Sequence, residues 1–363
     1  MKKVFILSLI FAMSFSLVGS VALADTSVTT SLTSDVSGGA APIVKAKWEA
    51  NTDRYTDYST EGGAQFMPSG IKDQNTTIAM CAIVTDPDGL ADITTVPGAV
   101  YADVFYPVNI ELGGSHTPLT DQSGLGCGKL MQEDSLTELD KQAGIDLFCI
   151  SVRENNENLP TFNFGYGYDE ICGEEGELWK DTAAVYCGEK TISYEDPSGD
   201  YIVWAVAQDK NGLQGTLENH FTYLPMTAFE TDFNQIAYGS VRLGTHKIIS
   251  GDKFWAPGVE GNKASVRNVG NTRLAMKIRQ NDMGLGKTDG LWNVKYDARV
   301  GSSAVYADYF PEVTTQLVDE LDLSELNEMD FSIDISKFPP ATGPNYIGTM
   351  TLSAVLVAHL VCD

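Results

Sequence analysis

The sequence predicts a mainly β protein built from two tandem antiparallel sandwiches, the first interrupted by a Cys-rich, partly helical insertion. The composition, with 34 Gly, 15 Tyr and 15 Phe beside many Thr and Val, is typical of β structure. The last part of the chain holds about seven short strand candidates in ~140 residues, which fits one sandwich. The earlier part repeats a strand followed by a corner, because Asp86 and Asp209 open matching stretches 123 residues apart.

The first 24 residues have the pattern of a secretory signal. Lys2 and Lys3 precede an uninterrupted apolar run, and Ala22-Leu23-Ala24 supplies the small residues of a cleavage site. The alternative, a membrane anchor, is disfavoured because the run is short and ends in small residues before a polar tract. We therefore expect residues 1–24 to be a signal peptide and the mature protein to be secreted or at the cell surface, with no membrane span.

Residues 25–41 form a Ser/Thr/Gly-rich leader, which we predict to be a flexible spacer. Its Thr/Val-rich part, residues 26–33, could instead add a strand to a neighbour's open sheet edge.

The chain is strongly acidic. Its formal net charge is −25, and loss of Lys2 and Lys3 with the signal leaves 22 − 49 = −27. A field of this sign repels nucleic acid and anionic membranes, so we expect no nucleic-acid partner. It favours cations and basic partners, or serves solubility alone.

The first sandwich is predicted over residues 42–225. Strand-like runs occupy 42–50, 76–84, 99–112, 200–208 and 215–225. Residues 112–190 are predicted to be the insertion, because four of the six Cys and two helix-like segments fall there. In residues 134–144, Ser135 and Glu138 have capping-box spacing and Gly144 can end a helix. Residues 174–190 place Leu178, Ala183 and Val185 at apolar helical positions.

Leu224-Pro225 marks the boundary to the second sandwich, predicted over residues 226–363. A short helix is expected within residues 312–326. The strand candidates are residues 228–238, 246–250, 263–269, 273–280, 292–300, 329–335 and 349–360.

The two corners have the residues of type I turns. Asp86-Pro87-Asp88-Gly89 and Asp209-Lys210-Asn211-Gly212 place Asp first and Gly fourth, with Asp or Asn third. The alternative is a calcium site formed by Asp86, Asp88 and Asp92. The second corner lacks the last two acids, however, and an EF-hand loop would place its Gly sixth. We predict structural turns, and no cofactor other than this possible calcium ion.

The cysteines predict disulfides, because export implies an oxidising compartment. The candidates are Cys127, Cys149, Cys172 and Cys187, which allow three connectivities. Cys172 could reach Cys187 only if a glycine broke the intervening helix, since a straight helix would hold them about 22 Å apart.

The other two cysteines lie outside this set. Cys81 aligns with Trp204 in the repeated strand and is expected to be buried and apolar, while the pairing of Cys362 stays open. No C-x-x-C spacing supports a zinc site.

Four aromatic residues alternate in the insertion: Phe162, Phe164, Tyr166 and Tyr168. In an extended chain all four would face one side. They could form a platform for sugar rings or for a partner chain. The alternative is that they pack the insertion against the sandwich.

Two stretches carry a resemblance to known proteins: "AIVTDPDGLADITTV" and "PSGDYIVWAVAQDKNGLQG". They resemble the edge-turn motifs of Ig-like and PKD-like modules in bacterial and archaeal surface proteins. FNQIAYGSV, SVRNVGNTRLAMKI and YIGTMTL in the second sandwich are similar to Ig-like repeats of exported envelope proteins. The resemblance implies two Ig-like sandwiches and a role in surface architecture, adhesion or assembly. It carries over no catalytic residues.

No catalytic motif is present in the sequence. The four His are isolated, and neither a G-x-S-x-G nor a complete phosphate-binding loop occurs. We predict a protein that is not an enzyme and acts through protein–protein contacts as a surface or extracellular structural protein. The alternative is an adhesin-type module that binds a glycan or another ligand through the aromatic-rich insertion.

Overall fold

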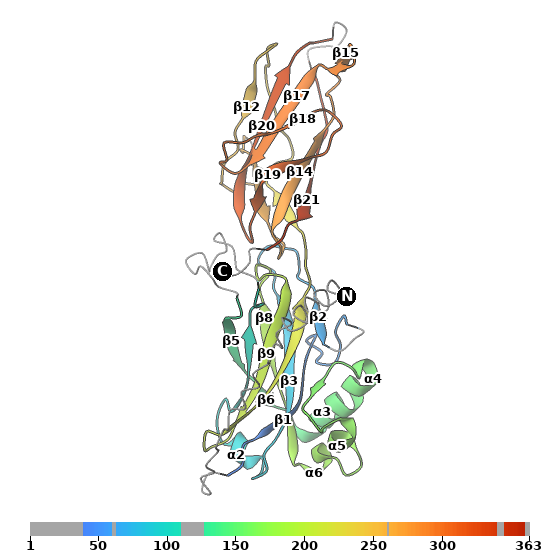
Figure 1. The fold of residues 1–363 in the computed structure, drawn as a ribbon, viewed down its shortest axis with the longest axis vertical. Coiled ribbons are helices and arrows are strands. Elements are labelled where there is room, and N and C mark those ends of the chain that lie inside the picture. The colour runs from blue at the N-terminus through green and yellow to red at the C-terminus, as the bar shows by residue number, and fades with distance from the viewer. Residues whose placement is uncertain (1–38, 60–62, 110–126, 260, 340–344, 360–363) are drawn as a thin grey trace, which may run out of the picture. The chain divides into compact units, whose positions relative to one another are not determined.

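The structure is a computed structural model that describes residues 39–59, 63–109, 127–259, 261–339 and 345–359. It is mainly β, which confirms the predicted class (Figure 1). The predicted signal peptide and most of the predicted leader lie outside these residues. Within the described ranges, no helix has the length and apolar character needed to cross a membrane.

Two sheets form the first sheet pair, which encloses one hydrophobic core. Its strands are β1 Ile43–Ala50, β2 Ala64–Phe66, β3 Thr76–Thr85, β4 Val100–Phe105, β5 Leu130–Ser135, β6 Thr137–Glu138, β7 Thr161–Phe162, β8 Ala183–Ile192, β9 Gly199–Gln208 and β10 Gln214–Tyr223. One sheet has the order β6-β8-β3-β1-β7, and the other has the order β2-β10-β9-β4-β5. All neighbours are antiparallel except β2 and β10.

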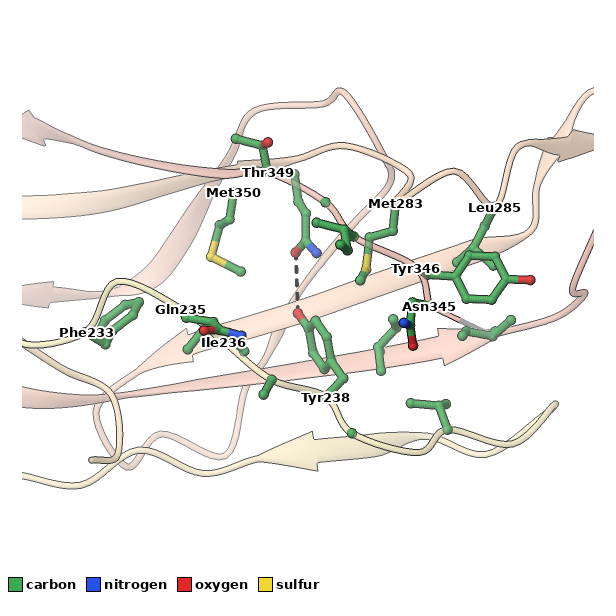
Figure 2. Close-up of a pocket in the computed structure, with 18 of the residues that line it drawn as sticks. Phe233, Gln235, Ile236, Tyr238, Met283, Leu285, Asn345, Tyr346, Thr349 and Met350 are labelled. Carbon is green, nitrogen blue, oxygen red and sulfur yellow. Dashed lines mark hydrogen bonds between the residues drawn. The ribbon is translucent and has the colours of Figure 1, made fainter. Parts of the chain in front are cut away.

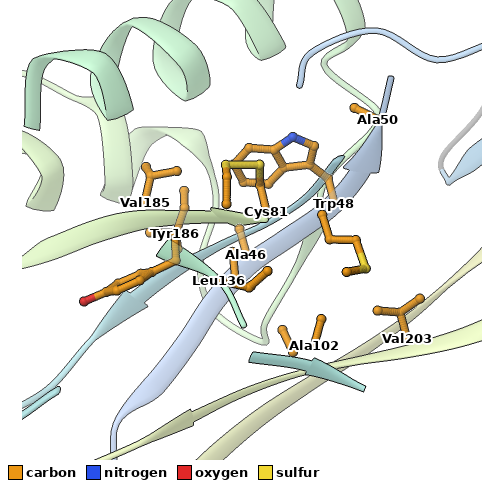
Figure 3. Close-up of a cluster of buried hydrophobic side chains, with 14 of the residues drawn as sticks. Ala46, Trp48, Ala50, Cys81, Ala102, Leu136, Val185, Tyr186 and Val203 are labelled. Atoms are coloured by element: carbon orange, nitrogen blue, oxygen red, sulfur yellow. A yellow bond between two sulfur atoms is a disulfide. The ribbon is translucent and has the colours of Figure 1, made fainter. Parts of the chain in front are cut away.

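Short helices cover the outer face of the β1–β3–β8 sheet, on the side away from the second sheet (Figures 1 and 3). They are α3 Lys141–Ile145, the π-helix η1 Asp146–Val152, α4 Arg153–Asn156, α5 Tyr168–Cys172 and α6 Glu177–Lys180. The Phe148 ring lies 5.1 Å from that of Trp48 on β1. Because helices cover one face and a sheet the other, β1 and β3 are buried on both faces.

The predicted insertion, residues 112–190, is corrected at both ends of its described part. Strand β5 pairs with β4, and β8 pairs with β3 along ten positions, so both belong to the sheets. The predicted helix 134–144 is strand to Glu138, and only its end lies in α3. Residues 183–190 are strand because Asp181, at φ +63°, ends α6 and the chain joins β3. Pairing across the sheet overrode local helix signals here.

The disulfides correct part of the expected set. Cys149 and Cys172, both candidates, are joined. Cys187 pairs instead with Cys81, which faces it across β8 and β3 (Figure 3). Cys127 is also disulfide-bonded, and none of the cysteines in the described ranges is free. Cys81 is buried as predicted, but it is cross-linked rather than a lone apolar residue.

A buried ionic network connects β1 with the second sheet. The Lys47 ammonium donates to Glu49 Oε1 at 2.6 Å, to the Val203 carbonyl at 3.2 Å and to Asn219 Oδ1. Asn219 in turn donates to Glu49 Oε2 at 2.6 Å. Burial lowers the pKa of Lys47, and the Glu49 carboxylate opposes that shift. Each of the three side chains therefore depends on the other two for its hydrogen bonds.

We expect Glu49→Gln to lower the free energy of unfolding by about 3 kcal/mol, because it leaves a buried ammonium without its counter-charge. The triple substitution Lys47→Met, Glu49→Leu and Asn219→Leu removes all the polar groups together and should recover most of that loss. Urea unfolding followed by circular dichroism measures both. A Glu49→Gln protein as stable as the wild type would contradict this account.

Both predicted corners are turns. The Gly89 amide donates to the Asp86 carbonyl at 2.9 Å, and the Gly212 amide donates to the Asp209 carbonyl at 3.0 Å. Each glycine has a positive φ, +107° and +83°. The Asp209 carboxylate also accepts the Asn211 and Leu213 amides, each at 2.8 Å. The side chain that opens the corner therefore holds its backbone, as type I turn chemistry requires.

The second sheet pair encloses a separate hydrophobic core. Its strands are β11 Phe229–Thr231, β12 Lys247–Ile249, β13 Ser265–Asn268, β14 Leu274–Gln280, β17 Val294–Val300, β18 Ala307–Tyr309, β19 Thr315–Leu321, β20 Leu326–Ile335 and β21 Met350–Leu356. One sheet has the order β11-β13-β20-β17-β18, with β12 also on β20, and the other has the order β19-β14-β21. The hairpin β15 Lys287–Thr288 and β16 Leu291–Trp292, and helix α2 Ala91–Thr94 beside the first corner, complete the described elements.

All seven strand candidates of residues 226–363 contain a strand. The helix predicted within residues 312–326 is wrong. Residues 315–321 form β19, whose Leu317 and Leu321 are buried while Val318 between them is 56% exposed. This approximate alternation fits a half-buried strand, and pairing with β14 satisfies its backbone.

Candidate binding groove

The β21 strand has one open edge. It pairs with β14 along all seven of its residues, from Met350 opposite Gln280 to Leu356 opposite Leu274. No strand in the described ranges pairs with its other edge. The backbone groups on that side therefore lack the ladder partners that a strand in the middle of a sheet has.

The direction of the β21 amides follows from the hydrogen bonds at its two ends. The Asn281 amide donates to the Thr349 carbonyl at 3.1 Å, and the Val357 amide donates to the Arg273 carbonyl at 3.0 Å. In an antiparallel pair, alternate residues make both their bonds to the same neighbour. The backbone amides and carbonyls of odd-numbered β21 residues thus point toward β14. The amides of even-numbered residues such as Leu352 and Ala354 point toward the open side.

The other sheet edges in the described part of the chain carry one of the usual protections. Proteins prevent edge strands from pairing with other chains by keeping these strands short or by placing charged side chains on them. The edge strands β5 and β19 contain carboxylates. The edge strands β2, β6, β7, β11, β12 and β18 have three residues or fewer. With the sequence MTLSAVL, β21 is longer and carries neither a charge nor a proline.

A groove of about 1250 Å³ opens beside β21 (Figure 2). One wall is β21 with the residues just before it, and the other is the end of β20 with the segment 233–241. The side chains in the walls are mostly apolar or aromatic. They include Phe233, Ile236, Met283, Ile333, Phe338, Tyr346 and Leu352.

Tyr238 and Gln280 line the floor of the groove, and the Tyr309 hydroxyl holds the Gln280 amide from outside the lining. Tyr238 donates to Gln280 Oε1 at 3.4 Å, the bond drawn in Figure 2, and Tyr309 donates to the same oxygen at 3.2 Å. Burial raises the pKa of both tyrosines above the usual value, so both remain donors. Gln280 ends β14, and the floor is therefore fixed to the strand that pairs with β21.

Exposure changes sharply between β14 and β21. Met276 and Ile278 on β14 are completely buried. On β21, Leu352 packs on the same core only partly buried, and Leu356 is 52% exposed. Ile347, in the wall before β21, is 85% exposed. Apolar surface and unpaired backbone therefore lie together along this edge, which is the combination that an added strand would cover.

The predicted aromatic platform does not form one face. Phe162 and Tyr168 pack on Phe148 of the helical layer, with ring centroids 6.2 and 5.0 Å away. Phe164 is 99% exposed. A turn at Asn163–Tyr166 breaks the extended geometry, because the Tyr166 amide donates to the Asn163 carbonyl at 3.1 Å. Packing against the sheet thus accounts for two of the four rings.

The three candidate calcium ligands have separate partners. Asp86 Oδ1 accepts the Asp88 amide at 2.7 Å, Asp88 Oδ2 accepts the Ala40 amide at 2.6 Å, and Asp92 Oδ1 accepts the Lys210 ammonium at 2.6 Å. In the described ranges, no three His, Cys, Asp or Glu side chains are grouped so as to hold a metal ion. The contact from Lys210 to Asp92 joins the two corners to each other, which is a structural use of these acids.

Sequence reasoning missed an exposed aromatic residue on the other sheet. Trp204 on β9 is 41% exposed, although its aligned partner Cys81 is buried. Asp103 on β4 and Glu218 on β10 lie directly beside it in the strand register. The Phe105 ring lies 6.0 Å away. The alternation of buried Tyr201, Val203 and Ala205 around Trp204 was the signal that could have found it.

Comparison with known proteins gives weak similarities only. No protein-family model matches the chain, and no curated protein matches it. Among solved structures, the C-terminal domain of the antigen I/II-family protein AspA of Streptococcus pyogenes is 12% identical, with a TM-score of 0.20 over 88% of this chain and 98% of that one. A structure of carbohydrate-binding modules from the β-sandwich superfamily is 8% identical, with a TM-score of 0.19 over 90% and 99%. Similarities this low say nothing about what this chain binds.

We expect Gln280→Leu to lower the free energy of unfolding by roughly 2 kcal/mol or more, because two buried hydroxyls lose their acceptor. Tyr238→Phe should cost less, about 1 kcal/mol, since Gln280 keeps its bond from Tyr309. Chemical unfolding of the three proteins measures the difference. Equal stability of wild type and Gln280→Leu would show that the floor is not held in this way.

Proposed function

We propose that this protein is an exported, non-catalytic structural or assembly protein of the cell surface or extracellular space. On this proposal it has two tandem Ig-like sandwiches and acts through protein–protein contacts. The observation that carries the proposal is the long, uncharged, open edge of β21 beside a groove with apolar and aromatic side chains in its walls. The disulfides support the compartment, because such bonds persist in oxidising surroundings.

The edge suits a polypeptide partner better than a small molecule. An extended segment can satisfy the amides of Leu352 and Ala354 with its own backbone and place alternate side chains in the groove. A small ligand could fill the groove, but it would leave most of the seven-residue edge unpaired. The contact we propose is therefore strand addition.

Leu356→Lys should weaken the association of the purified protein at least tenfold. A charge on the edge would have to lose its water when a strand is added. Val318→Lys is the matched control, because Val318 is 56% exposed on the opposite edge of the same sheet and Leu356 is 52% exposed. Sedimentation velocity reads the association, and labelled electron microscopy of native cells reads the location. Native protein found only free and monomeric would refute the proposal.

A second candidate function, glycan binding, rests on Trp204. Its exposed ring could stack on a sugar, while Asp103 and Glu218 beside it could accept hydrogen bonds from hydroxyl groups. This face replaces the aromatic row as the better platform, because Phe162 and Tyr168 of that row are packed on the helical layer. Tyr166, from the same row, stays a candidate.

A glycan array should separate these possibilities. If Trp204 holds a sugar, Trp204→Ala abolishes the hits of the wild type. Trp179→Ala, which removes a ring that is 45% exposed on α6, leaves them intact. Loss of the hits in Tyr166→Ala would instead place the glycan site at the aromatic row of the insertion. An array without hits would remove this candidate function.

A further inference from the structure

We propose that the strand added to β21 is the leader of a second copy of this chain, residues 26–37. This inference rests on the proposed function, because it names the partner for the same edge. It makes each molecule the donor of one strand and the acceptor of another. Self-assembly is then head to tail.

The leader sequence has the pattern of such a strand. From Thr26 to Ser37 it reads TSVTTSLTSDVS, in which Val28, Leu32 and Val36 recur at every fourth residue. In an extended chain these three side chains share one face, since alternate residues point the same way. The opposite face carries only Ser, Thr and Asp35. The face with Val28, Leu32 and Val36 can therefore contact the apolar and aromatic side chains of the groove while the other face stays in water.

The leader segment and β21 are also compatible in length and in charge. The twelve residues 26–37 exceed the seven of β21, so the leader can pair along the whole edge. Thr is abundant and Pro is absent in this segment, which favours a strand. Neither the leader segment nor β21 contains Lys or Arg, and so the contact leaves no buried cation unpaired.

The attachment point of the leader favours a second copy over the same chain. The Ala40 amide is held by Asp88 at the first corner, and the Pro42 carbonyl lies against Gly215 at the start of β10. The link to the second sheet pair leaves from Tyr223, at the other end of this ten-residue strand, about 30 Å away. A leader returning to that link from Ala40 would use about nine residues, back to residue 31, so Leu32 and Val36 would both be lost from the contact. A leader from another molecule loses none.

A contact between two different surfaces closes on itself in a dimer only when two copies exchange their leaders reciprocally. Otherwise each added copy presents a new open β21 edge, and growth continues into a chain or a larger ring. Both surfaces belong to an acidic molecule with a formal net charge of −25 over the full sequence. Salt screens the repulsion between copies, and association should therefore strengthen from 20 to 150 mM NaCl.

Mixing two full-length variants tests the proposal. Leu32→Asp disables the donor, and Thr33→Asp on the opposite face of the same segment is its control. Ala354→Pro disables the acceptor, because it removes an amide on the open side without touching the bonds to β14, and proline is tolerated at such edge positions. Ala354→Val is its control, since it keeps the amide. Mass photometry and sedimentation velocity measure the species formed.

We expect the wild type and both controls to form chains or rings, and each disabled variant alone to remain monomeric. Mixed in equal amounts, the two disabled variants should form a one-to-one dimer and nothing larger, because only one intact donor can meet one intact acceptor. If Leu32→Asp assembles like the wild type while Ala354→Pro does not, the edge binds another partner and only this inference fails. If Ala354→Pro also assembles normally, the proposed function fails with it. A mixture that stays monomeric would overturn the exchange between copies.

Discussion

A strand at the edge of a sheet has hydrogen-bonding groups on one side that no neighbouring strand satisfies. This constraint applies to every sheet edge of the protein. Among the edges in the described ranges, β21 is the one without the usual protection. The β5 and β19 edges carry carboxylates, and the remaining edges in the described part of the chain are very short. On β21, seven uncharged residues have no strand partner for their alternate amides in the described ranges, and they lie beside a groove with apolar and aromatic side chains in its walls. An open edge of this kind promotes aggregation in a protein that works as a monomer, whereas a protein that assembles can use it as a binding surface.

The contacts around β21 fix the conformation of this acceptor edge before a partner binds. Pairing with β14 fixes the strand along its full length. The floor of the groove depends on Gln280, which receives two buried hydroxyl groups. In the first sheet pair, the closed network of Lys47, Glu49 and Asn219 and the Cys81–Cys187 bond hold the strands that carry the leader. Preorganisation of this kind lowers the entropy lost when a strand is added.

The sequence predicted the parts of the fold that depend on local chemistry. The turns at Asp86 and Asp209 follow from Asp and Gly at fixed positions, and the strands of the second sheet pair follow from alternation and turn residues. It failed where pairing across the sheet competed with a helix pattern. Residues 183–190 look amphipathic as a helix, yet each of these eight residues has a backbone partner on β3.

The candidate sites were harder to predict, because they depend on topology. Cys187 was grouped with its neighbours in sequence, whereas its partner Cys81 lies across a strand pair. Nothing in MTLSAVL indicates that it ends a sheet, since that depends on which strands flank it. The prediction of an aromatic platform assumed that residues 162–168 are extended, but a turn at Asn163–Tyr166 interrupts them.

Residue-resolved hydrogen exchange along β21 tests the central claim most directly. In the isolated monomer, the amides of Leu352 and Ala354 should exchange rapidly, while those of Thr351 and Ser353, bonded to β14, should be protected. In the assembled protein all four should be protected. Protection of Leu352 and Ala354 already in the monomer, or rapid exchange at these two residues in the assembly, would contradict the account.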